Sequence, residues 1–127
     1  MPDHPLPPKI VLADKLALFD ERWTPKVVGA TNGQLVKLAK VEGDFVWHAH
    51  DDEDELFLVL RGRLVLEFRH GEVELGPGEL CIVPKGMEHK PRAAEETHLL
   101  LVEPASTAHT GKTLSERTVP TEAQEWI

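Results

Sequence analysis

The stretch from Gly43 to Gly62, GDFVWHAHDDEDELFLVLRG, constrains the fold of this chain more than any other stretch. Side chains of an extended strand alternate between its two faces, so His48 and His50 leave the same face. The acidic residues 51–54 have poor strand propensity and predict a turn, after which Glu55 opens an apolar strand. The stretch therefore predicts a β-hairpin that returns Glu55 to a place beside the two histidines.

Short apolar runs separated by Gly, Asn and Pro continue on both sides of this hairpin. Thr31-Asn32-Gly33 gives a strong turn signal between strands at 26–30 and 34–41. Further strands are expected at 44–50, 55–61, 63–69, 72–75, 79–84 and 95–102. Strands of this length at this spacing predict an all-β sandwich or barrel.

The segments that flank the strands lack this pattern. Residues 1–9 hold four prolines and predict an extended arm, and 13–19 predicts at most two helical turns. After Pro104 the alternation is lost, and a tail runs to the apolar residues Trp126 and Ile127. We expect a single domain over 1–127, made of an arm (1–25), a barrel (about 26–104) and a tail (105–127).

Charge and composition exclude several classes of protein. With 22 acidic against 14 basic residues, the formal net charge is -8, and the chain lacks the clustered Lys and Arg that nucleic acid requires. No apolar run approaches the ~20 residues that span a bilayer, and the N-terminus has neither the charged start nor the apolar block of a secretion signal. The single cysteine, Cys81, agrees with a reducing compartment. We expect a cytoplasmic protein that binds neither nucleic acid nor membrane.

Two stretches of the chain resemble the two motifs of the cupin superfamily. The first motif is matched by Gly43, His48, His50, Glu55 and Gly62. The second motif is matched by Gly78, Pro84, Gly86 and His89. There are two departures, neither of which removes a ligand: only four residues separate Gly43 from His48 where five are usual, and Ala93 stands where the second motif usually has Asn. The resemblance implies a cupin-type double-stranded β-helix, or jelly-roll barrel, preceded here by a short helical turn.

The resemblance also implies a metal centre. Its ligands would be His48, His50, Glu55 and His89. Three neutral imidazoles and one carboxylate suit Zn, Fe, Mn or Ni and leave open positions on an ion that prefers six ligands. An open position lets such an ion act as a Lewis acid, activate a water or bind O₂. The alternative is a barrel that binds no metal and keeps these groups as a polar pocket.

Other residues near the motifs admit two interpretations each. Phe57 and Met87 are expected to line the pocket, although a barrel interior needs apolar side chains in any case. Cys81 is expected to be a small buried residue, the alternative being a thiol that faces the pocket. His98 is expected to be structural. The acidic run 51–54 lacks the glycine and spacing of an EF-hand loop, so we expect a hydrated turn rather than a calcium site.

Two functions remain open, because the cupin fold alone does not give function. The first is a metalloenzyme, a dioxygenase or an isomerase, acting on a small polar or carbonyl-bearing molecule. Sugar phosphates are disfavoured, since only Lys85 and Lys90 are near the metal to bind phosphate. The second is a non-catalytic small-molecule binding or sensor module with a structural metal. Leucines on more than one face of the strands also predict a homodimer.

Overall fold

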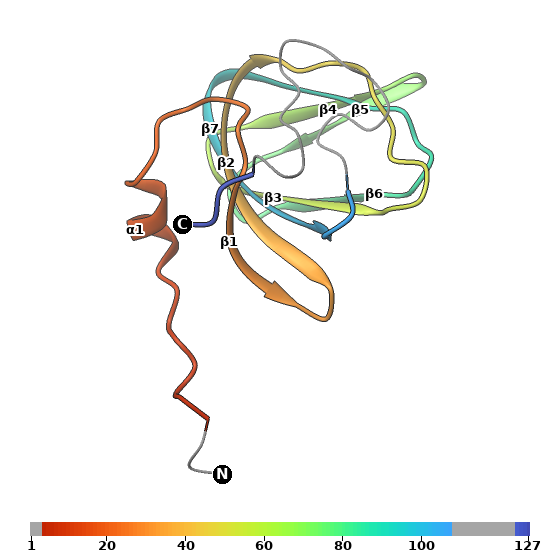
Figure 1. Cartoon of the computed structure of the whole chain (residues 1–127). Helices are drawn as coiled ribbons and strands as arrows, with labels where there is room; N and C mark the ends of the chain where they lie inside the picture. The colour runs from red at the N-terminus through yellow and green to blue at the C-terminus, as the bar shows by residue number, and fades with distance from the viewer. Residues whose placement is uncertain (1–3, 108–123) are drawn as a thin grey trace.

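The computed structural model describes residues 4–107 and 124–127, within which the chain forms one short helix and seven strands (Figure 1). The elements follow in the order α1 (Leu12–Leu16), β1 (Lys26–Thr31), β2 (Gln34–Asp44), β3 (Glu55–Arg61), β4 (Leu64–Phe68), β5 (Gly71–Leu75), β6 (Leu80–Val83) and β7 (Lys90–Pro104). The strands wrap into a barrel, and α1 lies outside it. The prediction of an all-β barrel with a short N-terminal helical turn is confirmed.

The hairpin between β1 and β2 forms where the turn signal predicts it. Asn32 and Gly33 have φ angles of 51° and 77°, the left-handed values that a two-residue type I′ turn requires at both central positions. Thr31 and Gln34 close the turn as a pair. The Asn-Gly dipeptide thus sets the register of the first two strands.

The longest strand, β7, holds the barrel together. The sheet runs in the order β1-β2-β7-β3-β6, and β4 pairs with both β5 and β7. The start of β7 pairs with β4, through Glu67 and Lys90, and its later residues pair with β3, through Val59 and Leu99. β7 itself is irregular opposite β2, where Val41 pairs with Thr97 but Gly43 pairs with Ala93, and such irregularities bend a strand. The other edge of β7 can therefore pair with β4 near its start and with β3 further along.

Two of the predicted strand boundaries are wrong. β7 begins at Lys90 rather than 95, although its first residues, KPRAAEE, have low strand propensity. Pairing with β2 and β4 on either side overrides that propensity. Residues 45–50 form no regular strand, since β2 ends at Asp44 and only His48 makes a bridge, to His89. The predicted β-hairpin between 44–50 and 55–61 is therefore wrong, because β7 lies between β2 and β3 in the sheet.

Alternation along the strands separates a core inside the barrel from a smaller cluster outside it. In β3, Glu55, Phe57 and Val59 are buried, whereas the leucines between them are half-buried. The outer cluster is centred on Phe19, Val28 and Leu38, against which α1 packs through Leu12 and Leu16, together with Ile127.

The end of the chain docks back on the barrel. The Val27 N–H donates to the Glu125 carbonyl at 2.8 Å, and the Ile127 N–H donates to the Val27 carbonyl at 2.9 Å. Residues 1–3 of the predicted arm and 108–123 of the predicted tail lie outside the described residues. Within the described ranges, no helix has the length and apolar character needed to cross a membrane.

Candidate metal centre

Three separate segments bring the predicted ligands together. His48 and His50 lie in the connection between β2 and β3, Glu55 is the first residue of β3, and His89 immediately precedes β7. Two backbone hydrogen bonds join the segments, since the His48 N–H donates to the His89 carbonyl at 3.0 Å and the His89 N–H donates to that of His48 at 2.9 Å. A third bond, from the Gly86 N–H to the His50 carbonyl at 2.7 Å, fixes the connection at its other end.

The four side chains form one buried group, which we call the His/Glu cluster. Its members are His48, His50, Glu55 and His89, and one potential ligand atom from each lies within 4.8 Å of all the others. The Glu55 Oε1 atom is 3.3 Å from His50 Nε2 and 3.5 Å from His89 Nε2. No member is more than 6% exposed. Atoms at these separations can surround a single ion.

Hydrogen bonds on the far side of two rings aim the free nitrogens inward. His48 Nδ1 lies 2.8 Å from the Val46 carbonyl, and His89 Nδ1 lies 3.0 Å from the Met87 carbonyl. A carbonyl only accepts, so each Nδ1 carries the proton and each Nε2 keeps its lone pair. A ligating histidine usually donates its other ring N–H in this way.

Several polar atoms in the cluster lack the hydrogen bonds that burial normally demands. Among the described residues, Glu55 Oε1, His89 Nε2 and both ring nitrogens of His50 are buried without a hydrogen-bond partner. Unsatisfied buried polar atoms are rare in folded proteins and indicate that a water or an ion binds them. A divalent cation at the centre of the cluster would satisfy Glu55 Oε1 and one nitrogen of each histidine, so the donor set fits a transition metal.

The electrostatics of the cluster suit a cation. Burial, with the neighbouring His89 adding to it, lowers the pKa of His48 to about 4, so this imidazole is neutral at neutral pH. Burial alone would raise the pKa of Glu55, but the facing imidazoles of His50 and His89 outweigh it and hold that pKa well below its ordinary value. The site thus presents a neutral imidazole at His48 and a carboxylate at Glu55, the protonation states that metal ligation requires.

A second carboxyl, which the sequence analysis missed, lies against the cluster. Glu103 of β7 is 3% exposed, and its Oε1 accepts a hydrogen bond from the Nζ of the equally buried Lys37 at 2.7 Å. Burial raises the pKa of Glu103 well above its ordinary value, and the negative charge of Glu55 raises it further. One sequence feature could have predicted this carboxyl. Lys37 shares a strand face with the apolar Ala39 on β2, and Glu103 shares one with the apolar Leu101 on β7, so two opposite charges stand at inward positions.

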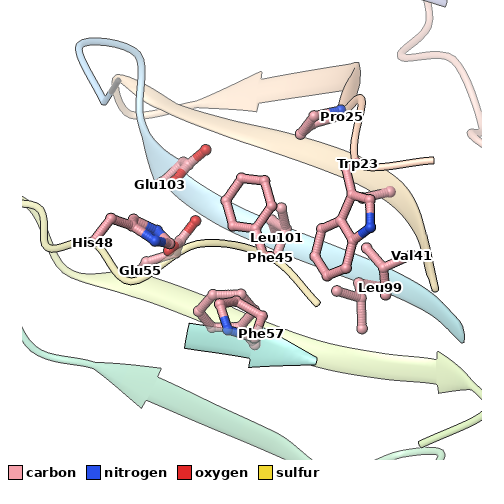
Figure 2. A pocket seen from close by; sticks show the side chains of 12 residues that line it. Trp23, Pro25, Val41, Phe45, His48, Glu55, Phe57, Leu99, Leu101 and Glu103 are labelled. Atoms are coloured by element: carbon pink, nitrogen blue, oxygen red, sulfur yellow. The ribbon is translucent and has the colours of Figure 1, made fainter. Parts of the chain in front are cut away.

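An apolar cavity adjoins one side of the cluster (Figure 2). It opens to solvent, and its volume, as space available to water-sized molecules, is about 40 Å³. Figure 2 shows His48, Glu55 and Glu103 at one end, Trp23 at the other, and Phe45 between them. The lining residues are Trp23, Pro25, Ala39, Val41, Phe45, His48, Glu55, Phe57, Pro91, Leu99, Leu101 and Glu103.

The other residues singled out in the sequence lie in three places. Phe57 lines the cavity. Met87 packs against the interior core and lines a separate surface hollow, which also contains Cys81. The Cys81 thiol is half-buried, and burial raises its pKa. His98 is outside the cluster, with its Nε2 2.6 Å from Glu96 Oε2.

Comparison with known proteins places these features in a family. Residues 34–104 match the family model of the cupin domain. The uncharacterized protein YdbB of Bacillus subtilis is 38% identical over 77 residues, which cover 60% of this chain and 68% of that protein.

Two solved structures share the fold. A cupin-2 domain containing protein from Shewanella frigidimarina is 46% identical, with a TM-score of 0.74 over 75% of this chain and 93% of that one. Protein NMB1881 from Neisseria meningitidis is 31% identical, with a TM-score of 0.70 over 76% of this chain and 99% of that one. Each alignment spans nearly the whole length of the solved structure.

Proposed function

This chain belongs to the cupin family, and from that premise we propose that it is an enzyme that binds one divalent transition-metal ion in the His/Glu cluster. The ion would be Zn, Fe, Mn or Ni, and the substrate a small molecule that reaches it from the apolar cavity. The observation that carries the proposal is the convergence of buried ligand atoms that lack hydrogen-bond partners at the edge of that cavity.

Each residue of the cluster has a role in this proposal. His48, His50 and His89 supply neutral nitrogens, and Glu55 supplies the negative charge that offsets part of the ion's charge. His48 and Glu55 line the cavity, whereas His50 and His89 do not, so a bound molecule would approach between the first two. When bound, the ion would supply Lewis acidity or, if redox-active, a site for O₂.

Dioxygenase and isomerase chemistry both fit this arrangement, and a non-catalytic binding module with a structural metal is the alternative. A cavity beside the ligand atoms supports a site in which a small molecule meets the ion, and of the two candidates only the enzyme uses both the ion and the space for its function. We further propose that the protein acts in the cytoplasm as a homodimer; its single cysteine supports the first of these and exposed apolar side chains support the second.

The first experiment measures the metal content of protein purified without chelators or affinity-column metal. We expect about one ion per chain in the wild type, because the four ligand atoms can surround one ion. His50→Ala should lower the content substantially, since it removes a ligand. His70→Ala is the matched control, because His70 is exposed in the turn between β4 and β5 and should not affect metal content. Full metal content in His50→Ala would contradict the ligand assignment.

The metal found then directs a substrate screen with and without oxygen. Turnover that requires oxygen would identify an oxygenase, and turnover without oxygen would favour an isomerase or another Lewis-acid reaction. Ligand binding without turnover under either condition would favour the binding module.

A further inference from the structure

Resting on the proposed metal site, we propose that the cavity selects a small molecule with an apolar, ring-shaped body, an oxygen donor at one end and no charge at the other. This narrows the proposed substrate class from small polar molecules in general to mainly apolar ones. The inference depends on the cavity walls, which are independent of the identity of the metal.

The walls away from the cluster are apolar and aromatic. Trp23 and Phe45 stack with their ring centroids 4.8 Å apart and their planes 13° from parallel, and both face the cavity. Phe57 and Leu101 complete the wall on the side of β3 and β7. Aromatic walls favour a flat apolar body, through offset or edge-to-face contacts.

Polar groups are confined to one end of the cavity. The lining side chains with polar groups are His48, Glu55 and Glu103, which Figure 2 shows at the same end, and Trp23, whose indole N–H already donates to the Glu42 carbonyl at 2.9 Å. The two acidic groups at this end are the carboxyls of Glu55 and Glu103, and within the described part of the chain no Lys or Arg lines the cavity. Lys37, a buried cation beside this end, already donates a hydrogen bond to Glu103 at 2.7 Å. A ligand therefore has its polar contacts at the metal end alone.

This distribution discriminates against two kinds of ligand. A phosphate or carboxylate far from the metal would be buried among apolar side chains without a compensating cation, which is unfavourable. A sugar or polyol would bury hydroxyl groups that find no hydrogen-bond partner, and each of them weakens binding. A neutral ring that carries one donor oxygen has neither penalty, since its oxygen reaches the ion and its body contacts Phe45 and Trp23.

The test uses protein loaded with Co²⁺, whose visible absorption reports changes among its ligands. We would titrate this protein with phenol, with 4-hydroxybenzoate and with glycerol. Phenol and 4-hydroxybenzoate share the ring and the donor oxygen, and only the second bears a remote carboxylate. We expect phenol to change the Co²⁺ spectrum and to bind at least about tenfold more tightly than either other probe. Equal or tighter binding of 4-hydroxybenzoate or glycerol would overturn the inference, as would no binding of phenol.

A variant that fills the cavity locates the binding. Ala39 lines the cavity from β2, so Ala39→Leu should abolish phenol binding while Co²⁺ remains bound. Ala94→Leu is the control, because Ala94 is exposed on β7 and the substitution should leave phenol binding unchanged. If Ala39→Leu fails to fold, Val41→Ile narrows the same cavity with one added methylene and should weaken phenol binding. Unchanged phenol binding in a folded cavity variant would overturn the inference.

These outcomes separate this inference from the proposed function. If the proposed function is wrong, the wild-type protein takes up neither Co²⁺ nor any other divalent metal. If only this inference is wrong, the protein binds metal but binds 4-hydroxybenzoate or glycerol at least as tightly as phenol, or does not bind phenol.

Discussion

At the scale of single residues, the buried pair of Lys37 and Glu103 needs an explanation. Removing two charges from water costs several kcal/mol per ion, and well-packed apolar residues often stabilise a core as much or more. The pair lies next to the His/Glu cluster. Lys37 forms an ion pair with Glu103, and the carboxyl of Glu103 lies against that of Glu55. We therefore assign the pair a positioning role, in which it keeps Glu55 turned toward the ion.

Substitutions at Glu103 test this role. Glu103→Gln keeps an oxygen for Lys37 and an N–H for Glu55, and should leave metal affinity within about threefold of the wild type. Glu103→Leu should lower metal affinity by about 10- to 100-fold, as does loss of other groups that orient metal ligands. It should also lower the free energy of unfolding by about 3–5 kcal/mol, because Lys37 is left buried without its partner.

A double variant separates positioning from stability. Lys37→Met combined with Glu103→Leu removes both buried polar groups, so it should recover most of the unfolding free energy. It should still bind metal at least about tenfold more weakly than the wild type, because Glu55 has lost its support. Isothermal titration with Zn²⁺ and urea unfolding measure the two quantities. Metal affinity equal to that of the wild type in the double variant would leave the pair a purely structural role.

His48 makes the stability of the metal-free protein depend on pH. Burial, with His89 adding to it, lowers its pKa to about 4 in the folded state, whereas an unfolded chain has the ordinary value near 6.5. The unfolded state thus binds the proton more readily between these values. The contribution of His48 is complete above about pH 6.5 and falls by roughly 2–4 kcal/mol as the pH drops to about 4.

Urea unfolding in EDTA at pH 7 and pH 4.5 measures this loss. His48→Gln is the matched control, because glutamine does not titrate. The wild type should lose more unfolding free energy than the variant between the two pH values. An identical loss in both proteins would mean that His48 does not cause the pH dependence.

At the scale of elements, the turn between β3 and β4 depends on one glycine. Gly62 has a φ of 89°, and a Cβ at this position would lie 2.4 Å from Thr97 Oγ1 and 2.8 Å from the Glu96 carbonyl oxygen. Thr97 cannot move away easily, since it is fully buried and its hydroxyl accepts from the Arg63 N–H at 3.1 Å. Both the backbone conformation and the space therefore require glycine.

Gly62→Ala should lower the free energy of unfolding by about 3 kcal/mol or more, because the left-handed conformation and the steric overlap both oppose it. Gly86→Ala is the control, since Gly86 has a similar φ of 81° but nothing within 4 Å of an added Cβ. The control should lose only about 1–2 kcal/mol, the cost of the conformation alone. Equal losses in urea unfolding would show that the contact with Thr97 contributes little.

The sequence predicted those elements whose local pattern agrees with their tertiary partners. The strand over 55–61 and the Asn-Gly hairpin carry both strand propensity and a defined turn, and the structure places both as expected. The start of β7 has little strand propensity, so its extent depends on neighbours that are distant in sequence.

The candidate site was likewise predictable only in part. The His/Glu cluster follows motif spacing and was found from the sequence. Glu103 was not, because its place beside Glu55 depends on which strands are neighbours and on their register, which no local pattern contains.

At the scale of the whole molecule, one outer face of the barrel remains apolar and exposed. Leu80 and Ile82 on β6 are 53% and 55% exposed, and they pair with Leu58 and Leu56 on β3. We call these four side chains the β3–β6 outer face. β6 also ends the main strand path of the described sheet, so its outer edge has no strand partner there. Exposed apolar edge strands are uncommon in monomers, because they promote association.

A second copy of the chain is the simplest cover for this face, because a two-fold axis pairs a self-complementary patch with itself. The cluster of Phe19, Val28 and Leu38 already covers the outer face nearer to β1, with α1 and Ile127. The extended arm is a further element that can cross to the partner, since Leu6 is 91% exposed and the arm runs away from the barrel (Figure 1).

We expect the wild-type chain to sediment as a dimer, with twice the 14.2 kDa mass of one chain. Ile82→Asp should shift it to the monomer, because a charge in the β3–β6 outer face is easily hydrated in a monomer but costly to bury. Leu18→Asp is the control, since Leu18 is a 65% exposed apolar residue shortly after α1, outside this face, and the substitution should leave the dimer intact. Deletion of residues 1–9 should weaken association if the arm crosses. A wild-type monomer at micromolar concentration would refute the dimer, whereas a dimer indifferent to Ile82→Asp would place the interface elsewhere on the barrel.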